Sequence, residues 1–231
     1  MFPTFIRPCN ILFKMLHWYY DTFLQQIFKL LQPFVEYYTG DDEMSTMQPI
    51  RDITQVRALI DYYNERNNPR NHLLVLMSLH TALRIGDLLR LTWQQVYDFD
   101  NNRPRSTLTI TEQKTGKNKT IALNAGICDV LGLYSCDARP ERFLFANGMS
   151  NRAISRAQAY RIIRAASEAL GFETHCSCHS LRKTFGYHAW KNGVSPAVIM
   201  EIYNHSSLAI TRRYLGVAQS DLNEVYMGLE F

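Results

Sequence analysis

Strand-type alternation of threonine with aliphatic residues, set in a chain that otherwise shows helical spacing, most limits the folds open to this sequence. The alternation covers residues 107–111 and resumes over residues 120–123. The polar connection over residues 113–119 contains a glycine, so the two runs predict an antiparallel hairpin. A third strand is expected near Tyr97 and Phe99. The predicted fold class is therefore mainly α-helical with a small antiparallel β-sheet.

Helical periodicity and helix punctuation account for most of the remaining sequence. Apolar residues recur at helical intervals over residues 56–63 and 73–79, and again over 160–166 before Gly171. Further helices are expected from Ser180 to Gly193, from Ser195 and Pro196 to Asn204, from Ser206 or Ser207 onward, and along a terminal apolar stripe formed by Leu222, Val225, Tyr226 and Leu229. That stripe needs a cover, either from its own body or from another subunit.

A polar, acidic run divides the chain. Residues 40–49 read as a linker, which places a domain boundary near residue 48 and predicts an N-terminal helical segment over 1–48 and a compact domain over 49–231. The N-terminal segment holds three basic and five acidic residues and therefore has a net charge of −2. The larger domain has a net charge of +6, which gives the overall +4. This balance permits an anionic partner.

Composition excludes several other classes of protein. No apolar run approaches the roughly 20 residues of a membrane span, and no secretory signal is recognisable, so no membrane partner is expected. The five cysteines are an odd number, which favours a reducing, cytoplasmic setting over a disulfide framework. Cys176 and Cys178, between His175 and His179, are spaced too tightly for a usual structural zinc site. Neither a metal nor a cofactor is expected.

Three separated motifs hold the residues suited to chemistry on a phosphodiester. They are TALRIGDLL over residues 81–89, HSLR over 179–182, and NHSSLAITRRY over 204–214. In order, spacing and residue type they resemble the tyrosine recombinases, the family of phage integrases and chromosome-dimer resolvases. The resemblance covers residues 49–231 and implies the catalytic-domain fold of that family.

The resemblance implies a role for each motif residue. Arg84 is the first phosphate-binding arginine, His179 and Arg182 form the His-x-x-Arg pair, His205 is the second histidine, and Tyr214 is the nucleophile. Lys114 near the hairpin tip matches the catalytic lysine of the family, although Lys117 and Lys119 lie close enough in sequence to be confused with it. Asp87 is expected to orient Arg84 or to cap the next helix.

These residue types fit the chemistry that the resemblance implies. Guanidinium groups stay charged and match the geometry of phosphate oxygens, which gain charge in the transition state. A tyrosine has a reference pKa of about 10 and needs activation, for which His179 is the expected proton acceptor. His205 is expected to donate a hydrogen bond to the phosphate, and Lys114 to protonate the departing 5′ oxygen.

Each of these residues also has an ordinary structural interpretation. A His and an Arg three positions apart form a common helix-surface pair, a tyrosine commonly packs in a core, and a lysine solubilises a turn. The family also often has glycine before its second histidine, where this chain has Asn204, and usually has a larger helical domain before the catalytic one. Only about 48 residues precede it here.

The functional expectation is site-specific recombination of double-stranded DNA through a 3′-phosphotyrosyl intermediate, performed by a homo-oligomer, a tetramer on synapsed DNA, that docks through the terminal stripe. The same active-site chemistry also serves DNA relaxation by type IB topoisomerases. A third interpretation, from a different class, is a DNA-binding regulator derived from a recombinase that no longer recombines DNA.

Overall fold

The computed structural model describes residues 47–148 and 150–229. The chain divides into two compact units, Met1–Met44 and Ser45–Phe231. The first unit, and with it most of the predicted N-terminal helical segment, lies outside the described residues, so the boundary near residue 48 stays a prediction.

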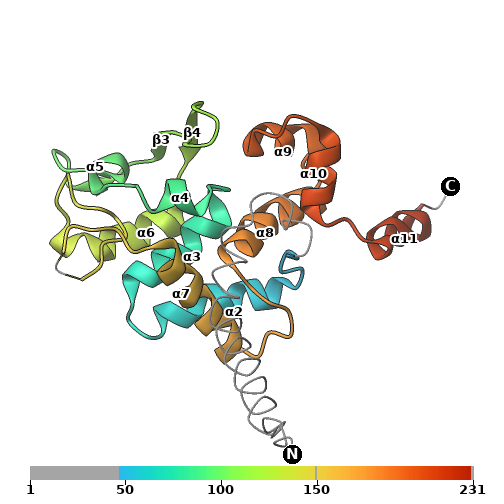
Figure 1. Cartoon of the computed structure of the whole chain (residues 1–231), viewed down its shortest axis with the longest axis horizontal. Coiled ribbons are helices and arrows are strands. Elements are labelled where there is room, and N and C mark those ends of the chain that lie inside the picture. The colour runs from blue at the N-terminus through green and yellow to red at the C-terminus, as the bar shows by residue number, and fades with distance from the viewer. Residues whose placement is uncertain (1–46, 149, 230–231) are drawn as a thin grey trace, which may run out of the picture. The chain divides into compact units, whose positions relative to one another are not determined.

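Helices make up most of the described domain (Figure 1). In chain order the elements are α2 (Ile53–Asn64), α3 (Pro69–His80), α4 (Ile85–Leu88), α5 (Trp93–Val96), β1 (Tyr97–Asp98), β2 (Arg103–Pro104), β3 (Thr107–Thr111), β4 (Asn118–Ala122), α6 (Ala125–Tyr134), the 3₁₀ turn η2 (Ser135–Asp137), α7 (Arg156–Ala169), α8 (Cys178–Lys191), α9 (Pro196–Tyr203), α10 (Leu208–Leu215) and α11 (Gln219–Gly228). The predicted fold class is confirmed.

The predicted hairpin is present, but the predicted third strand is not part of it. Strands β3 and β4 pair antiparallel from Thr107 opposite Ala122 to Thr111 opposite Asn118. The side chains of β3 alternate between exposed and buried, as the sequence pattern requires. Tyr97 lies in β1, which pairs with β2 in a separate two-stranded sheet, so the expected extension of the hairpin was wrong.

Helix α3 is the centre of the hydrophobic core. Leu73, Leu74, Val75 and Met77 have no exposed surface, which requires apolar neighbours on every side of the helix. One face packs into a cluster with α6 and the hairpin, and the other packs into a cluster with α2, α7 and α8. Because α3 joins both clusters, the hairpin and α8 are positioned by one shared scaffold.

Helix ends follow the predicted punctuation, with one correction. Ser195 and Ser207 cap α9 and α10, and α9 ends at Asn204 in the left-handed conformation with φ 54°. Helix α8 begins at Cys178 rather than at Ser180, because Ser177 accepts hydrogen bonds from the backbone N–H groups of His179 and Ser180. The cap therefore lies one turn earlier than expected.

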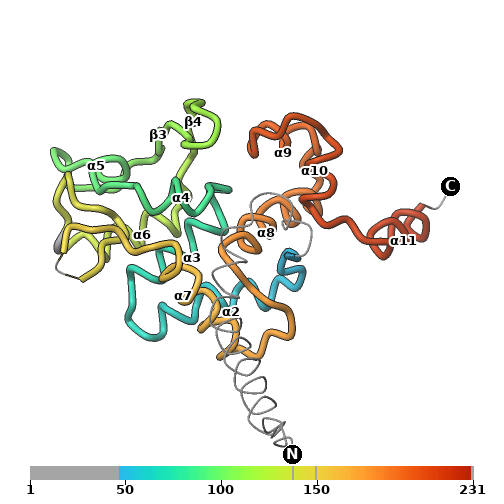
Figure 2. The backbone as a smooth tube through the Cα atoms, viewed as in Figure 1, coloured from blue at the N-terminus to red at the C-terminus, as the bar shows by residue number. Residues whose placement is uncertain are grey.

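The C-terminal helix exposes its apolar residues. Figure 2 shows the chain running from α8 through α9 and α10 into α11. Val225, Tyr226 and Leu229 are 58%, 77% and 60% exposed, whereas Leu222 at the start of the predicted stripe is partly buried. No described part of the chain covers the outer three residues. Within the described residues, no helix has both the length and the apolar character needed to cross a bilayer.

Two glycines in helices should respond oppositely to replacement by alanine. A Cβ at Gly186 in α8 would lie 2.8 Å from Tyr203 Cε2 and 2.9 Å from Leu215 Cδ2, whereas a Cβ at Gly132 in α6 would meet nothing within 4 Å. Overpacking costs about 1–3 kcal/mol, so Gly186→Ala should lower the free energy of unfolding. Gly132→Ala should raise it by about 0.5–1 kcal/mol. Urea denaturation measures both, and equal effects would contradict the packing described for α8.

Candidate active site

Arg84 stands at the start of α4, on a turn whose backbone is constrained just before it. Ala82, fully buried, has a positive φ of 54°, which is unusual for a residue with a Cβ. The Arg84 guanidinium donates from Nη1 to Glu112 Oε2 over 3.1 Å. The side chain of Asp87 contacts the hairpin, since its Oδ1 accepts from the backbone N–H of Gln113 over 2.9 Å. The carboxylate therefore anchors the hairpin to α4.

Helix α8 carries Arg182 into the interior of the domain. The side chain is 3% exposed, which is exceptional for a charged group. Its Nε donates to the Tyr214 hydroxyl over 3.1 Å, and Nη2 donates to the Tyr203 carbonyl over 3.4 Å. Nη1 has no hydrogen-bond partner within the described part of the chain. A buried donor of this kind suits an anion as its partner.

The Tyr214 ring lies between two histidines. Tyr214 belongs to α10 and is 4% exposed. Its ring centroid is 5.1 Å from that of His179 on α8 and 5.0 Å from that of His205, which follows α9. The structure thus brings together Arg182, His179, His205 and Tyr214 from two separate sequence motifs.

His205 is held in a cationic environment. Its Nδ1 is 3.1 Å from Thr211 Oγ1. Burial lowers the pKa of His205 to about 4, and the charges of Arg182, Arg84 and Lys114 act in the same direction. The ring is therefore neutral near pH 7. Because Arg84 and Lys114 influence His205 electrostatically, both belong to the same neighbourhood.

The three hairpin lysines occupy different environments. Lys114 and Lys117 are exposed, whereas Lys119 on β4 is partly buried and donates from Nζ to the carbonyl of Ile202 over 2.7 Å. Burial lowers the pKa of Lys119 to about 8, assisted by Arg182 and Arg84 and opposed by Glu112. The choice of Lys114 as the catalytic lysine stays a prediction, with Lys119 now a second lysine close to the arginines.

Glu112 is a site residue that the sequence interpretation missed. It has no exposed surface and accepts hydrogen bonds at Oε2 from Arg84, Thr115 and Asn204. Burial raises the pKa of Glu112, but the donors and the nearby cations outweigh it and hold the pKa below its usual value. A carboxylate in a polar turn gives no sequence signal that it will be buried.

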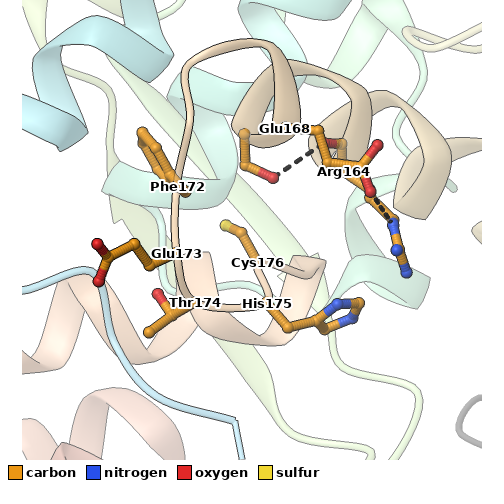
Figure 3. Close-up of a pocket in the computed structure, with 8 residues that line it drawn as sticks. Arg164, Glu168, Phe172, Glu173, Thr174, His175 and Cys176 are labelled. Carbon is orange, nitrogen blue, oxygen red and sulfur yellow. Dashed lines mark hydrogen bonds and ion pairs between the residues drawn. The ribbon is translucent and has the colours of Figure 1, made fainter.

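Neither the cysteine cluster nor the pocket beside it belongs to this arrangement. Burial raises the pKa of both Cys176 and Cys178 to about 12, so the thiols resist the ionisation that metal binding requires. Across residues 47–148 and 150–229, no group of three or more His, Cys, Asp or Glu side chains is placed to hold a metal. A pocket of about 190 Å³ lies between α7 and the segment before α8, beside the Arg164–Glu168 ion pair, and none of the six predicted catalytic residues lines it (Figure 3).

Comparison with known proteins shows the family of this chain. The model of the phage integrase family matches residues 52–221. The chain belongs to the phage integrase family. The probable integrase/recombinase YoeC of Bacillus subtilis (strain 168) is 36% identical over 183 residues, which cover 79% of this chain and 97% of YoeC. Among the other curated family members, a tyrosine recombinase of Pseudothermotoga lettingae is 25% identical, and the chain covers 56% of it.

Solved structures of family members share the fold. The crystal structure of XerA recombinase superposes with a TM-score of 0.64 at 23% identity, covering 80% of this chain and 68% of XerA. The post-cleavage complex of the XerH site-specific recombinase with its palindromic difH substrate superposes with a TM-score of 0.61 at 19% identity, covering 78% of this chain and 53% of XerH. The described domain therefore has the family fold.

The neutral state of His205 predicts a pH dependence of stability. The unfolded chain takes up a proton at this histidine as the pH falls through about 6.5, whereas the folded chain resists protonation until about 4. His205 should therefore make stability decline as the pH falls between these values, and contribute no slope above them. In urea titrations at successive pH values, wild type should lose more stability than His205→Gln across this window. Parallel curves would contradict the assigned environment of His205.

Proposed function

We propose that this chain is a site-specific recombinase that cuts and rejoins double-stranded DNA through a covalent bond to Tyr214. The observation that carries the proposal is the buried Tyr214 hydroxyl, hydrogen-bonded to Arg182 Nε and flanked by the rings of His179 and His205. Family relatives named as recombinases and integrases favour recombination over plasmid relaxation or simple DNA binding. The structure of XerH recombinase was solved with its difH substrate, and that of the Tn1549 transposon integrase with transposon right end DNA, which supports DNA as the partner.

Arg84 and Arg182 suit the stabilisation of the scissile phosphate. Attack on phosphorus places charge on the nonbridging oxygens, and prepositioned cations lower the energy of that state. Arg182 is held by hydrogen bonds to Tyr203 and Tyr214 with Nη1 still available, so it can bind an oxygen without reorganising. Arg84 is similarly held by Glu112.

Tyr214 is proposed to attack phosphorus. The adjacent Arg182 charge favours the phenolate, and His179 is proposed to accept the phenolic proton. The bond from the tyrosine oxygen to phosphorus forms as the bond from phosphorus to the 5′ oxygen breaks, and Lys114 donates a proton to that oxygen. The products are a 3′-phosphotyrosyl protein and a free 5′ hydroxyl. Attack by a second 5′ hydroxyl reverses these steps on the new strand.

Synapsis is proposed to require several copies of the chain. Val225 and Tyr226 on α11, with Leu229 just after it, are exposed apolar side chains that another copy can cover. Docking of this stripe on a neighbour is proposed to hold the tetramer together on synapsed DNA.

Covalent trapping tests the nucleophile. The probe is a pool of duplexes with randomised sequence and a nick next to the central position, so that cleavage releases a short strand and prevents religation. Wild-type protein should form an adduct that survives denaturing electrophoresis, and sequences recovered from adducts should converge on a preferred site. Tyr214→Phe should form none, because the change removes the hydroxyl that accepts from Arg182 Nε. Tyr62→Phe on α2 is the matched control and should behave as wild type.

A sulfur substitution tests the proposed acid. In the selected duplex, sulfur replaces the bridging 5′ oxygen at the cleaved phosphate, and a thiol with a pKa of about 8.5 leaves without a proton donor. Lys114→Ala should slow adduct formation by about 100-fold or more on the oxygen substrate. It should restore near wild-type rates on the sulfur substrate. Lys117→Ala is the matched control, and a sulfur-dependent rescue of that variant instead would move the acid assignment to Lys117.

A further inference from the structure

Two charged residues of the hairpin contact the C-terminal end of α9. Glu112 directly follows β3, and its Oε2 accepts from Asn204 Nδ2 over 2.9 Å. Lys119 on the neighbouring strand β4 donates to the Ile202 carbonyl over 2.7 Å. These contacts join residues 92 and 83 positions apart in sequence. In Figure 1 the hairpin and α9 are separate elements, and the hydrogen bonds of Glu112 and Lys119 join them.

Both contacts end at the helix terminus that leads into His205. Carbonyl groups in the last turn of a helix lack partners within the helix and carry partial negative charge, so the Lys119 ammonium is well matched to Ile202. Asn204 adopts the left-handed conformation that ends α9, and its side chain fixes that turn to Glu112. His205 is the next residue, and Tyr214 follows on α10. The hairpin therefore restrains the segment that carries two of the predicted catalytic residues.

The same carboxylate restrains the other side of the site. Glu112 Oε2 also accepts from Arg84 Nη1 over 3.1 Å and from Thr115 Oγ1 over 2.9 Å. Thr115 adjoins Lys114 in the hairpin connection. One buried oxygen thus links Arg84, the Lys114 turn and the end of α9.

Electrostatics gives a reason for a buried charge at this point. Arg84 and Arg182 both lie close enough to Lys119 to lower its pKa, and like charges repel strongly where water is excluded. An ionised Glu112 offsets part of that repulsion before any phosphate is bound. Burying a carboxylate is otherwise unfavourable, and apolar packing would stabilise the fold at least as well. The buried position of Glu112 is better explained by the contacts that it fixes than by a gain in the stability of the fold.

We propose that Glu112 and Lys119 are positioning residues for transesterification, holding the hairpin with Lys114 in register with the α9–α10 segment that carries His205 and Tyr214. This inference rests on the proposed function. Attack and departure must lie on opposite sides of phosphorus, so the nucleophile and the proton donor have to be held at a set separation. A displacement of about 1 Å is enough to slow such a reaction on the order of 100-fold.

The test compares variants on the selected duplex with either bridging oxygen or bridging sulfur. Asn204→Gly is the sharpest variant, because glycine keeps the left-handed turn and removes only the amide that contacts Glu112. Glu112→Gln removes the charge with little change of shape, Lys119→Ala removes the contact with Ile202, and Lys119→Arg restores a donor there. Lys117→Ala, exposed in the same hairpin, is the matched control.

We expect a loss in the rate of adduct formation that the sulfur substrate does not restore. Asn204→Gly, Glu112→Gln and Lys119→Ala should each slow adduct formation by about 10- to 100-fold on both substrates, because misplacement impairs attack as well as departure. Lys119→Arg should recover part of the rate. Combining Asn204→Gly with Glu112→Gln should slow the reaction less than the product of the single effects, since both weaken the same contact. Melting temperatures of Asn204→Gly and wild type should differ far less than their rates.

Two outcomes would overturn the inference. Wild-type rates in folded Asn204→Gly, Glu112→Gln and Lys119→Ala would show that the contacts do not position the site. Recovery of Lys119→Ala on the sulfur substrate alone would make Lys119 the proton donor and not a positioning residue. Failure of the proposed function is distinct from both, because wild-type protein would then form no Tyr214-dependent adduct on any duplex of the pool.

Discussion

The burial of the Arg182 guanidinium is the constraint on which the rest of this site depends. A permanent charge that is 3% exposed must be surrounded by acceptors, or its desolvation is not offset. The acceptors come from α9 and α10, through the Tyr203 carbonyl and the Tyr214 hydroxyl. Packing α9 and α10 on α8 therefore both provides acceptors for Nε and Nη2 of the arginine and positions the tyrosine. The position of Tyr214 follows from the hydrogen bond that its hydroxyl accepts from the buried Arg182.

The scaffold below this constraint is made from ordinary apolar packing. Helix α3 is buried on all sides and joins the cluster that supports the hairpin to the cluster that supports α8. Asp87 then pins the hairpin to α4, and Glu112 and Lys119 connect the hairpin to α9. The scaffold is thus held by apolar packing around α3, and the elements that carry the site are joined by directional hydrogen bonds. Precision is concentrated where the proposed chemistry requires it.

Sequence reasoning succeeded where residue type and spacing reflect local physics. Alternation over residues 107–111 predicted β3, and the Ser195 and Asn204 punctuation predicted both ends of α9. The motif spacing also predicted the residues that converge with Arg182 and Tyr214, although their catalytic roles stay predictions.

The sequence did not predict contacts whose partners lie far away in sequence. Glu112 and Lys119 lie in a polar hairpin, where charged residues are normally solvated, and their burial depends on Arg84 and α9. The strand at Tyr97 was predicted, but its partner was not, because strand pairing is decided by the chain path after β1. Ser180 was predicted to start a helix, but the Ser177 side chain accepts hydrogen bonds from the backbone N–H groups of His179 and Ser180 and caps the helix earlier.

The neutral His205 ring has a consequence for how the domain takes up a polyanion. Its low proton affinity arises from burial and from the surrounding cations, and an incoming phosphate compensates those cations directly. Proton affinity at the imidazole must then rise on complex formation, so binding and protonation are thermodynamically linked. Mild acidification should favour the complex, and calorimetric traces in buffers of different ionisation enthalpy should differ by the heat of the protons taken up.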